Sequence, residues 1–342
     1  MATDVTSGNK NLVIGAAQNC GDWNALEPFV MSFKKNIPNA DLVLFLDAPS
    51  PFTQNELNSA GVRIKQIPSK LRKEIVNRRW IVFKDFLEIH KEYEKIFACD
   101  VRDVIFQGDI FLKYTEHKNF LAYSTFGYKI KDEPTNYSWI KNNFGEDEVE
   151  KIQDNFVAGG SMFYGTHREI NILFENIIKF LRKKTDWGDD QAITNYLVYN
   201  KILPIENIIE SDIQKGEFVN LDYVGSKFSS LEDKTFKIST DKIQTLNGWT
   251  PTVIHQWNLP KFLEVVQLVD RIYRVKDFQV DKNFVDVSSA IDQMFCMIQR
   301  FQWNEDAEFL VDKILHSRNL KLYSEKVTKL RKLIATNYTV DS

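Results

Sequence analysis

The segment "IFACDVRDVIFQGDIF" at residues 96–111 places charged side chains between two apolar runs. Its first four residues have the composition of a strand that is buried on both faces. Asp100 and Asp103 follow at the carboxyl end of that strand, where ligands of open α/β sheets gather. Two carboxylates three residues apart can converge there on one hard divalent cation. Capping of the next turn by Asp100 and pairing of Asp103 with Arg102 remain the structural alternative, and Asp109 is interpreted as a helix start.

Strand-like and helix-like segments alternate through the first half of the chain. Short apolar runs typical of buried strands occur at residues 11–17, 40–48, 61–67, 96–99 and 156–165. Helical spacing of apolar residues occurs at residues 24–36, 78–95, 168–183 and 189–200. Residues 127–155 have the pattern of a long loop with short helices. This alternation predicts an α/β fold with a mixed, mostly parallel sheet flanked by helices.

The last part of the chain has a different pattern. Helical periodicity recurs at residues 261–275, 287–301, 305–318 and 324–337. We therefore predict two parts, a domain at 1–260 and a helical extension or small helical domain at 261–342. The extension either packs on the first domain or mediates oligomerisation, and the sequence leaves both open.

The bulk composition narrows the class of protein. The 342 residues carry a net charge of −3, which gives no sign of a nucleic-acid partner. The three cysteines lie far apart, so we expect no disulfide framework and a reducing compartment. The polar N-terminus lacks a signal-peptide pattern, and no apolar run approaches the roughly 20 residues of a membrane helix. The expectation is a soluble, cytoplasmic protein with no transmembrane segment.

Four segments, in order, resemble the GT-A class of nucleotide-sugar-dependent glycosyltransferases. "FACDVRDVIFQGDIF" resembles the metal-binding Asp-any-Asp motif of the class, in its D-x-R-D variant. "FVAGGSMFYG" resembles the strand that lines the donor and acceptor pocket, and "WGDDQAITNYL" the acidic segment beside the reacting sugar. "VIHQWN" resembles the late segment whose histidine completes the metal site. The resemblance covers residues 11–258 and does not extend to the helical part.

The resemblance implies a metal site and a donor site. Asp100, Asp103 and His255 would bind Mn²⁺ or Mg²⁺, which would bridge the two phosphates of a UDP- or GDP-sugar. In isolation, His255 has the alternative of a core histidine at a strand end. The residues that the resemblance places near the nucleotide or diphosphate are Ala16, Ala17, Gln18, Arg78, Arg79, Asp100, Arg102, Gly159 and Gly160.

The resemblance also implies catalytic and acceptor-binding residues. The catalytic candidates are Asp190, Gln191 and Asp189, because a carboxylate beside the anomeric carbon can act as base, nucleophile or charge stabiliser. The "DDQ" form resembles retaining members of the class, and helix capping is the alternative for Asp189. The acceptor candidates are Tyr137, Trp139 and Trp257, for which core packing is the alternative.

The predicted function is therefore that of a hexosyl- or pentosyltransferase. It would move a sugar from a nucleoside diphosphate sugar to a hydroxyl of a glycan or other acceptor. One alternative is a sugar-phosphate nucleotidyltransferase, although the segment "GAAQNCGDWN" after the first strand lacks the basic phosphate loop of those enzymes. The other alternative is a non-catalytic glycan-binding protein on a transferase-like fold.

Overall fold

The computed structural model describes residues 10–18, 23–182, 185–221, 236–258 and 263–274, with isolated positions at 294, 310, 311, 313, 314 and 328. The helices predicted at 287–301, 305–318 and 324–337 lie outside this part of the chain, apart from those isolated positions. None of the described helices is long and apolar enough to cross a membrane.

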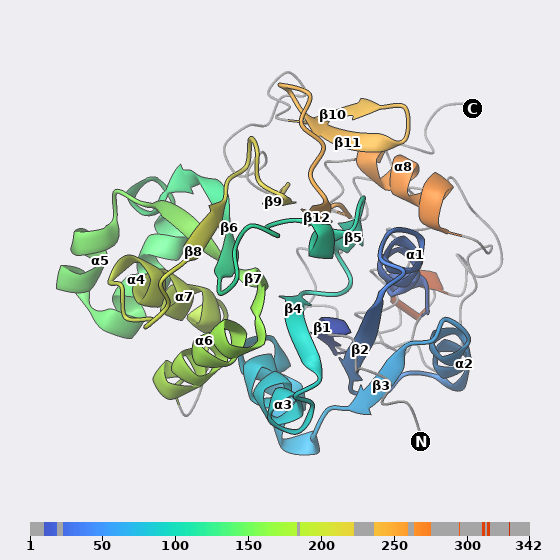
Figure 1. Cartoon of the computed structure of the whole chain (residues 1–342), viewed down its shortest axis with the longest axis horizontal. Helices are drawn as coiled ribbons and strands as arrows, with labels where there is room; N and C mark the ends of the chain where they lie inside the picture. Colours follow the sequence, from blue (N-terminus) through green and yellow to red (C-terminus); the bar gives the residue numbers. More distant parts are fainter. Residues whose placement is uncertain are drawn as a thin grey trace, which may run out of the picture.

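A seven-stranded sheet forms the centre of the molecule, in the order β3-β2-β1-β4-β7-β6-β8 (Figure 1). The strands are β1 (Lys10–Ala17), β2 (Ala40–Leu46), β3 (Arg63–Gln66), β4 (Tyr93–Cys99), β6 (Leu121–Lys129), β7 (Phe156–Thr166) and β8 (Ile208–Ser211). The pairs β3–β2, β2–β1, β1–β4 and β6–β8 are parallel, whereas β7 is antiparallel to both of its neighbours. The predicted mixed, mostly parallel sheet is therefore confirmed.

Helices cover both faces of this sheet. They are α1 (Glu27–Asn36), α2 (Pro51–Ser59), α3 (Ile75–Ile89), α6 (His167–Phe180) and α7 (Asp189–Tyr199). Successive residues of a strand point to opposite faces, so Leu12 and Ile14 of β1 pack with α3, α6 and α7. Val13, between them, packs with α1 and α2. Burial on both faces explains why these strands have continuous apolar runs.

The predicted loop region at 127–155 contains the end of β6 and two short helices, α4 (Pro134–Phe144) and α5 (Glu146–Ile152). A small second sheet joins β5 (Val104–Phe106), β12 (Val253–His255) and β9 (Phe218–Asn220) in that order. A hairpin of β10 (Phe236–Ser239) and β11 (Lys242–Thr245) lies above it in Figure 1. The helix α8 (Leu263–Tyr273) packs against this part, where Tyr273 Oη donates a 2.9 Å hydrogen bond to the carbonyl of Phe106.

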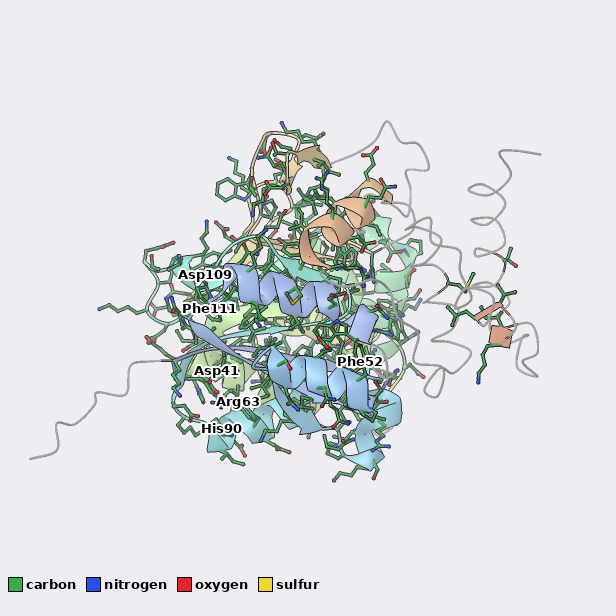
Figure 2. The ribbon with its side chains drawn as sticks, turned by 90° about the vertical axis from the view of Figure 1, so that its right-hand side faces the viewer. Asp41, Phe52, Arg63, His90, Asp109 and Phe111 are labelled. Atoms are coloured by element: carbon green, nitrogen blue, oxygen red, sulfur yellow. The ribbon has the colours of Figure 1, made fainter. Side chains whose placement is uncertain are left out.

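Figure 2 labels two pairs of residues whose polar contacts stabilise outer elements of the fold. Arg63 on the edge strand β3 lies 3.2 Å from Asp41 on β2, which ties the edge strand to its neighbour. Asp109 accepts a 2.9 Å hydrogen bond from the backbone N–H of Phe111 and caps a 3₁₀ turn at Ile110–Leu112. The interpretation of Asp109 as a helix start rather than a ligand is confirmed for this short helix.

Candidate metal centre

Three potential metal ligands from distant parts of the sequence meet at one edge of the sheet. Asp100 follows β4 and Asp103 precedes β5, while His255 is the last residue of β12. His255 Nε2 lies 3.3 Å from Asp103 Oδ2 and 3.5 Å from Asp100 Oδ2. One ligand atom of each residue lies within 4.8 Å of those of the other two. Two carboxylates and one imidazole at this separation could hold one divalent cation.

Backbone pairing brings these three residues together. β12 runs antiparallel to β5, which places His255 opposite Val104, one residue from Asp103. The backbone N–H of Gln256 also donates a 2.7 Å hydrogen bond to the carbonyl of Asp103. On the other side, the N–H of Asp100 donates to the carbonyl of Ser161 on β7 at 3.0 Å. The candidate metal centre therefore lies at the junction between the large and small sheets.

The imidazole of His255 is oriented by groups behind it. Its Nδ1 is hydrogen-bonded to Asn220 Oδ1 and lies 3.2 Å from Ser161 Oγ. Asn220 in turn donates from Nδ2 to Ser124 Oγ at 3.1 Å. These contacts direct the buried Nε2 toward the carboxylates, and Nε2 has no hydrogen-bond partner in the described structure. An oriented, unsatisfied imidazole nitrogen beside two carboxylates fits a metal ligand.

The pKa values of His255 and Asp100 are shifted by the charged groups around them. Burial alone would lower the pKa of His255, but the nearby carboxylates of Asp103 and Asp100 outweigh burial and raise it to about 10. For Asp100, burial raises the pKa, yet the charges of Arg79 and His255 leave it below its ordinary value. The two carboxylates therefore favour a positive charge between them, which a divalent cation can supply in place of the imidazolium proton.

Arg79 on α3 links the metal centre to the start of α7. Its guanidinium lies 3.4 Å from Asp100 Oδ1 and 3.1 Å from Asp190 Oδ2, and it donates a 2.6 Å hydrogen bond to the carbonyl of Gly160. The guanidinium also lies 4.3 Å from the centre of the Trp80 ring. Burial raises the pKa of Asp190 to about 6, although Arg79 opposes the shift. The structure thus brings together the predicted Arg79, Asp100 and Asp190.

The predicted Gln191 and both glycines lie beside Asp190. Gln191 Oε1 accepts a 3.3 Å hydrogen bond from the N–H of Gly160, and its amide nitrogen donates to Asn136 on α4. A Cβ atom at Gly160 would lie 2.9 Å from Cα of Gln191, and one at Gly159 would lie 2.7 Å from Ser124 Oγ. Protein groups of α7 and β6 therefore lie directly against these two glycines.

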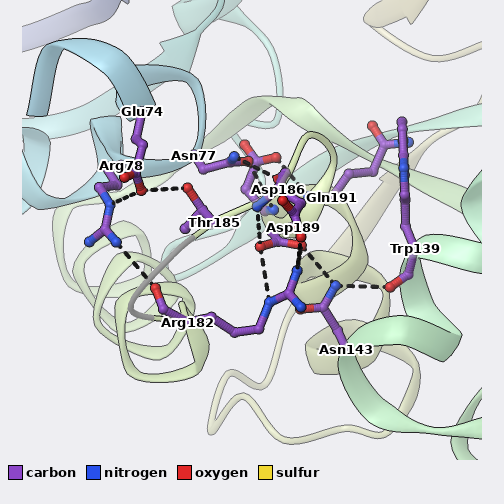
Figure 3. Close-up of polar contacts among 11 residues, drawn as sticks. Glu74, Asn77, Arg78, Trp139, Asn143, Arg182, Thr185, Asp186, Asp189 and Gln191 are labelled. Carbon is purple, nitrogen blue, oxygen red and sulfur yellow. Dashed lines mark hydrogen bonds and ion pairs between the residues drawn. The ribbon is translucent and has the colours of Figure 1, made fainter.

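Figure 3 shows the polar contacts of Asp189, which differ from the contact of Asp190 with Arg79. The carboxylate of Asp189 accepts hydrogen bonds from Arg182 Nη2 at 2.7 Å, Asn143 Nδ2 at 3.0 Å and the backbone N–H of Asp186 at 2.9 Å. Asp189 is buried by these contacts and joins α4 to the segment before α7. These contacts give Asp189 a structural role other than helix capping, since α7 begins without a side-chain cap hydrogen bond, and they leave Asp190 as the carboxylate that faces Arg79.

The other two predicted arginines lie apart from Arg79. Arg78 pairs with Glu74 at 2.6 Å and donates a hydrogen bond to the carbonyl of Arg182 at 3.2 Å. Its guanidinium therefore belongs to the group of polar contacts that includes Arg182 and Asp189 (Figure 3). Arg102 is exposed, and its charge contributes to the lowered pKa of Asp100. Arg102 therefore points toward solvent beside the candidate metal centre.

The remaining donor candidates lie at the same edge of the sheet. Gly15 pairs with Cys99 in the parallel register of β1 and β4. Ala16, Ala17 and Gln18 therefore continue β1 beside the point where Asp100 leaves β4. Ala17 is buried, whereas Ala16 and Gln18 are partly exposed.

The acceptor candidates are all held by protein contacts. Tyr137 Oη donates a 2.6 Å hydrogen bond to Glu146. The indole of Trp139 covers Gly188, where a Cβ atom would lie 2.3 Å from the ring. Trp257 is buried in the hydrophobic cluster between the small sheet and α8, which leaves no ring face for a sugar.

Several supporting residues are not marked by any periodic pattern in the sequence. These are Ser124, Asn220, Asn136, Asn143 and Arg182. Asn220 ends a three-residue strand, so no periodicity marks it, and Ser124 lies in the mixed run "LAYSTFGYK". One sequence feature could have indicated Asn220 as a site residue, because it directly follows the apolar pair "FV" at a strand end.

Comparison with family models and with curated proteins finds no match to this chain. Among solved structures, the chain is similar to the apo form of the bifunctional glycosyltransferase WbbM, with 12% identity over 78% of this chain and 51% of that one, at a TM-score of 0.48. It is similar to the galactosyltransferase LgtC in complex with donor and acceptor sugar analogues, with 12% identity over 78% of this chain and 98% of that one, at a TM-score of 0.43. It is also similar to glucosyl-3-phosphoglycerate synthase from Mycobacterium tuberculosis, solved with Mn²⁺, UDP and glucosyl-3-phosphoglycerate. The identity is 12% over 60% of this chain and 71% of that one, at a TM-score of 0.38. The chain thus spans about half the length of WbbM.

Proposed function

We propose that this chain is a metal-dependent glycosyltransferase of the GT-A class, which moves a sugar from a nucleoside diphosphate sugar to an acceptor hydroxyl. The observation that carries the proposal is the convergence of Asp100, Asp103 and His255. Their oxygen and imidazole donors suit Mn²⁺ or Mg²⁺. A bound cation of this kind would stabilise the charge that develops on a leaving diphosphate.

The residues around the candidate metal centre support a binding site for a nucleoside diphosphate sugar. The backbone at Ala16 and Gln18 continues β1 beside Asp100 and would take the base and ribose of a UDP- or GDP-sugar. Arg79 is held between Asp100 and Asp190, so its role is to position these two carboxylates. Arg102 is exposed beside Asp100 and would contact the diphosphate.

Asp190 is the carboxylate that we assign to the reacting sugar. It lies at the start of α7, with Oδ1 accepting a 2.9 Å hydrogen bond from the N–H of Gln191. A fixed carboxylate at this position would stabilise positive charge at the anomeric carbon, as a retaining reaction requires. Gln191 would orient the sugar, and Asp189 would hold the loop in place.

The test is nucleotide binding with and without Mn²⁺, followed by a screen of UDP- and GDP-sugars for hydrolysis and transfer. We expect Asp103→Asn and His255→Gln to weaken metal-dependent nucleotide binding by more than about 100-fold, because loss of an outer partner already costs about 10–100-fold. Asp147→Asn, on the exposed side of α5, and His90→Gln are matched controls that should bind as the wild type does.

Two results would contradict the proposal. Unchanged metal-dependent binding in both Asp103→Asn and His255→Gln would remove the metal centre from the mechanism. Release of pyrophosphate from a sugar phosphate and a nucleoside triphosphate would instead indicate a nucleotidyltransferase.

A further inference from the structure

A cavity of about 590 Å³ lies between the large sheet and the hairpin of β10 and β11. Its volume falls in the range of roughly 300–1,000 Å³ that is typical of small-molecule sites. Its walls come from the end of β6, the start of β7, the end of β8 and the turn after β11. Its lining residues include Thr125, Phe126, Phe156, Glu210, Leu246 and Asn247.

The rim of this cavity combines exposed apolar groups with hydrogen-bonding groups. Phe156 is 43% exposed and Leu246 is 61% exposed, although both are large apolar side chains. Glu210 and Asn247 are also exposed and offer carboxylate and amide groups at the same opening. An aromatic face beside hydrogen-bonding side chains suits a ligand that has both an apolar C–H face and hydroxyl groups.

The charge of the cavity excludes one large class of ligands. Glu210 and Asp212 both line it, while none of the described lining residues is lysine, arginine or histidine. Glu210 accepts a 3.1 Å hydrogen bond from Thr125, and Asp212 accepts hydrogen bonds from backbone N–H groups of the following turn. A phosphate, nucleotide or acidic sugar would meet these carboxylates without a counter-charge, so the nucleotide donor does not suit this cavity.

Strand β6 connects the cavity to the metal centre. Thr125 lines the cavity, and the preceding residue, Ser124, accepts a 3.1 Å hydrogen bond from Asn220. Asn220 is the residue that holds the imidazole of His255. Adjacent residues of one strand therefore support the metal centre and form a wall of the cavity.

We propose that this cavity binds the acceptor of the reaction, and that the acceptor is a saccharide without acidic groups. The inference rests on the proposed function for its second half, the role as acceptor. The C–H face of a pyranose would lie against Phe156, and its hydroxyl groups would donate to Glu210 and exchange hydrogen bonds with Asn247. Leu246 would cover the opposite edge of the ring.

The test is ligand-observed saturation-transfer NMR with methyl glucoside and methyl galactoside, in both anomeric forms, without any donor. We expect signals from the wild type and from Asp103→Asn, because the cavity does not need the metal. Phe156→Ala and Glu210→Gln should each weaken binding by at least about tenfold. The matched controls are Leu112→Ala, at an exposed position, and Glu56→Gln, at a partly exposed position, both outside the cavity.

The outcomes separate this inference from the proposed function. Weakened saccharide binding in Phe156→Ala, with Mn²⁺-dependent UDP or GDP binding intact, supports the inference. Unchanged binding in both cavity variants, or a preference for methyl glucuronide over methyl glucoside, overturns it. Failure of the wild type to bind any nucleotide with Mn²⁺, while saccharide binding persists, refutes the transferase function and with it the acceptor role.

Discussion

Replacement of Arg79 by methionine tests whether this residue neutralises Asp190 inside the protein. The side chains of Arg79 and Asp190 are 4% and 6% exposed, so neither charge is well solvated. Methionine keeps an apolar stem beside Trp80 but leaves the carboxylate buried without its partner. Breaking a buried ion pair in this way costs about 3–5 kcal/mol of unfolding free energy. We expect a loss of this size at pH 8.

A double variant separates loss of the pair from loss of packing. Arg79→Met with Asp190→Asn removes both charges, and asparagine can still accept the hydrogen bond from the N–H of Gln191. We expect the double variant to be more stable than Arg79→Met alone by at least about 2 kcal/mol, because no uncompensated charge remains. Asp100 adds little to this difference because a third of its side chain is exposed.

The dependence on pH gives a second check on the same reasoning. Burial raises the pKa of Asp190 to about 6 in the wild type, and loss of Arg79 should raise it further. A carboxyl whose pKa is raised by folding contributes stability below its unfolded pKa, and that stability is lost as the pH rises through the folded pKa. The penalty of Arg79→Met should therefore be smaller at pH 5 than at pH 8.

The assay is urea unfolding of the wild type, both single variants and the double variant at pH 5 and pH 8, with linear extrapolation. A penalty for Arg79→Met that is equal at both pH values would refute the electrostatic reasoning. Additive effects of the two substitutions would do the same, because they would show that the pair does not interact.

Three further predictions concern positions outside the metal centre. Gly188→Ala should lower the unfolding temperature, because Gly188 has φ +85° and an added Cβ would lie 2.3 Å from the Trp139 ring. Glu74→Gln should destabilise the protein at pH 7, since hydrogen bonds from Arg78 and Thr185 lower the pKa of Glu74 to about 2; this effect should disappear as the pH falls from about 4.5 through 2, measured by thermal unfolding. Tyr273→Phe should cost about 0.5–1.5 kcal/mol in urea unfolding, because it removes a buried hydrogen bond of 2.9 Å.

Each of these predictions has a matched control. Gly145→Ala has a similar φ of +93° with open space around the Cβ, so it should destabilise less than the change at Gly188. Glu150→Gln, on the exposed side of α5, should show no comparable pH dependence, and Tyr137→Phe removes a hydroxyl contact that is only partly buried. Equal effects of a variant and its control would contradict the reason given for that variant.

The strand that positions the first two candidate metal ligands could be predicted from the sequence, for a physical reason. A strand buried on both faces needs apolar residues throughout, so β4 has a continuous run that ends sharply at Asp100. The strands β5, β9 and β12 have three residues each and show no periodicity. The sheet that places His255 was therefore not predictable from local pattern. Helix α2 was missed as well, although Ser50 followed by Pro51 is a helix-start signal that was available.

The local sequence pattern could not distinguish the roles of Asp189 and Asp190. Both are acidic, both begin α7 and both are buried, so helix propensity and the helix dipole treat them alike. Their partners distinguish them, because Arg182 lies seven residues before Asp189 whereas Arg79 approaches Asp190 from α3. Only the reach of Arg79 from α3 to the start of α7 decides which carboxylate faces the candidate metal centre.

The balance of charge at the metal centre explains why an exposed arginine follows Asp100. Three carboxylates gather here with one buried guanidinium, because Arg79 pairs with Asp100 and Asp190 while Asp103 pairs with His255. A divalent cation with a neutral His255 would bring these groups to zero net charge, so a bound diphosphate would add negative charge that none of them offsets. Arg102 is exposed beside Asp100 and can turn toward such a group without losing a buried contact. Its place between the two metal-ligand candidates is therefore best explained by the charge of the donor that we propose.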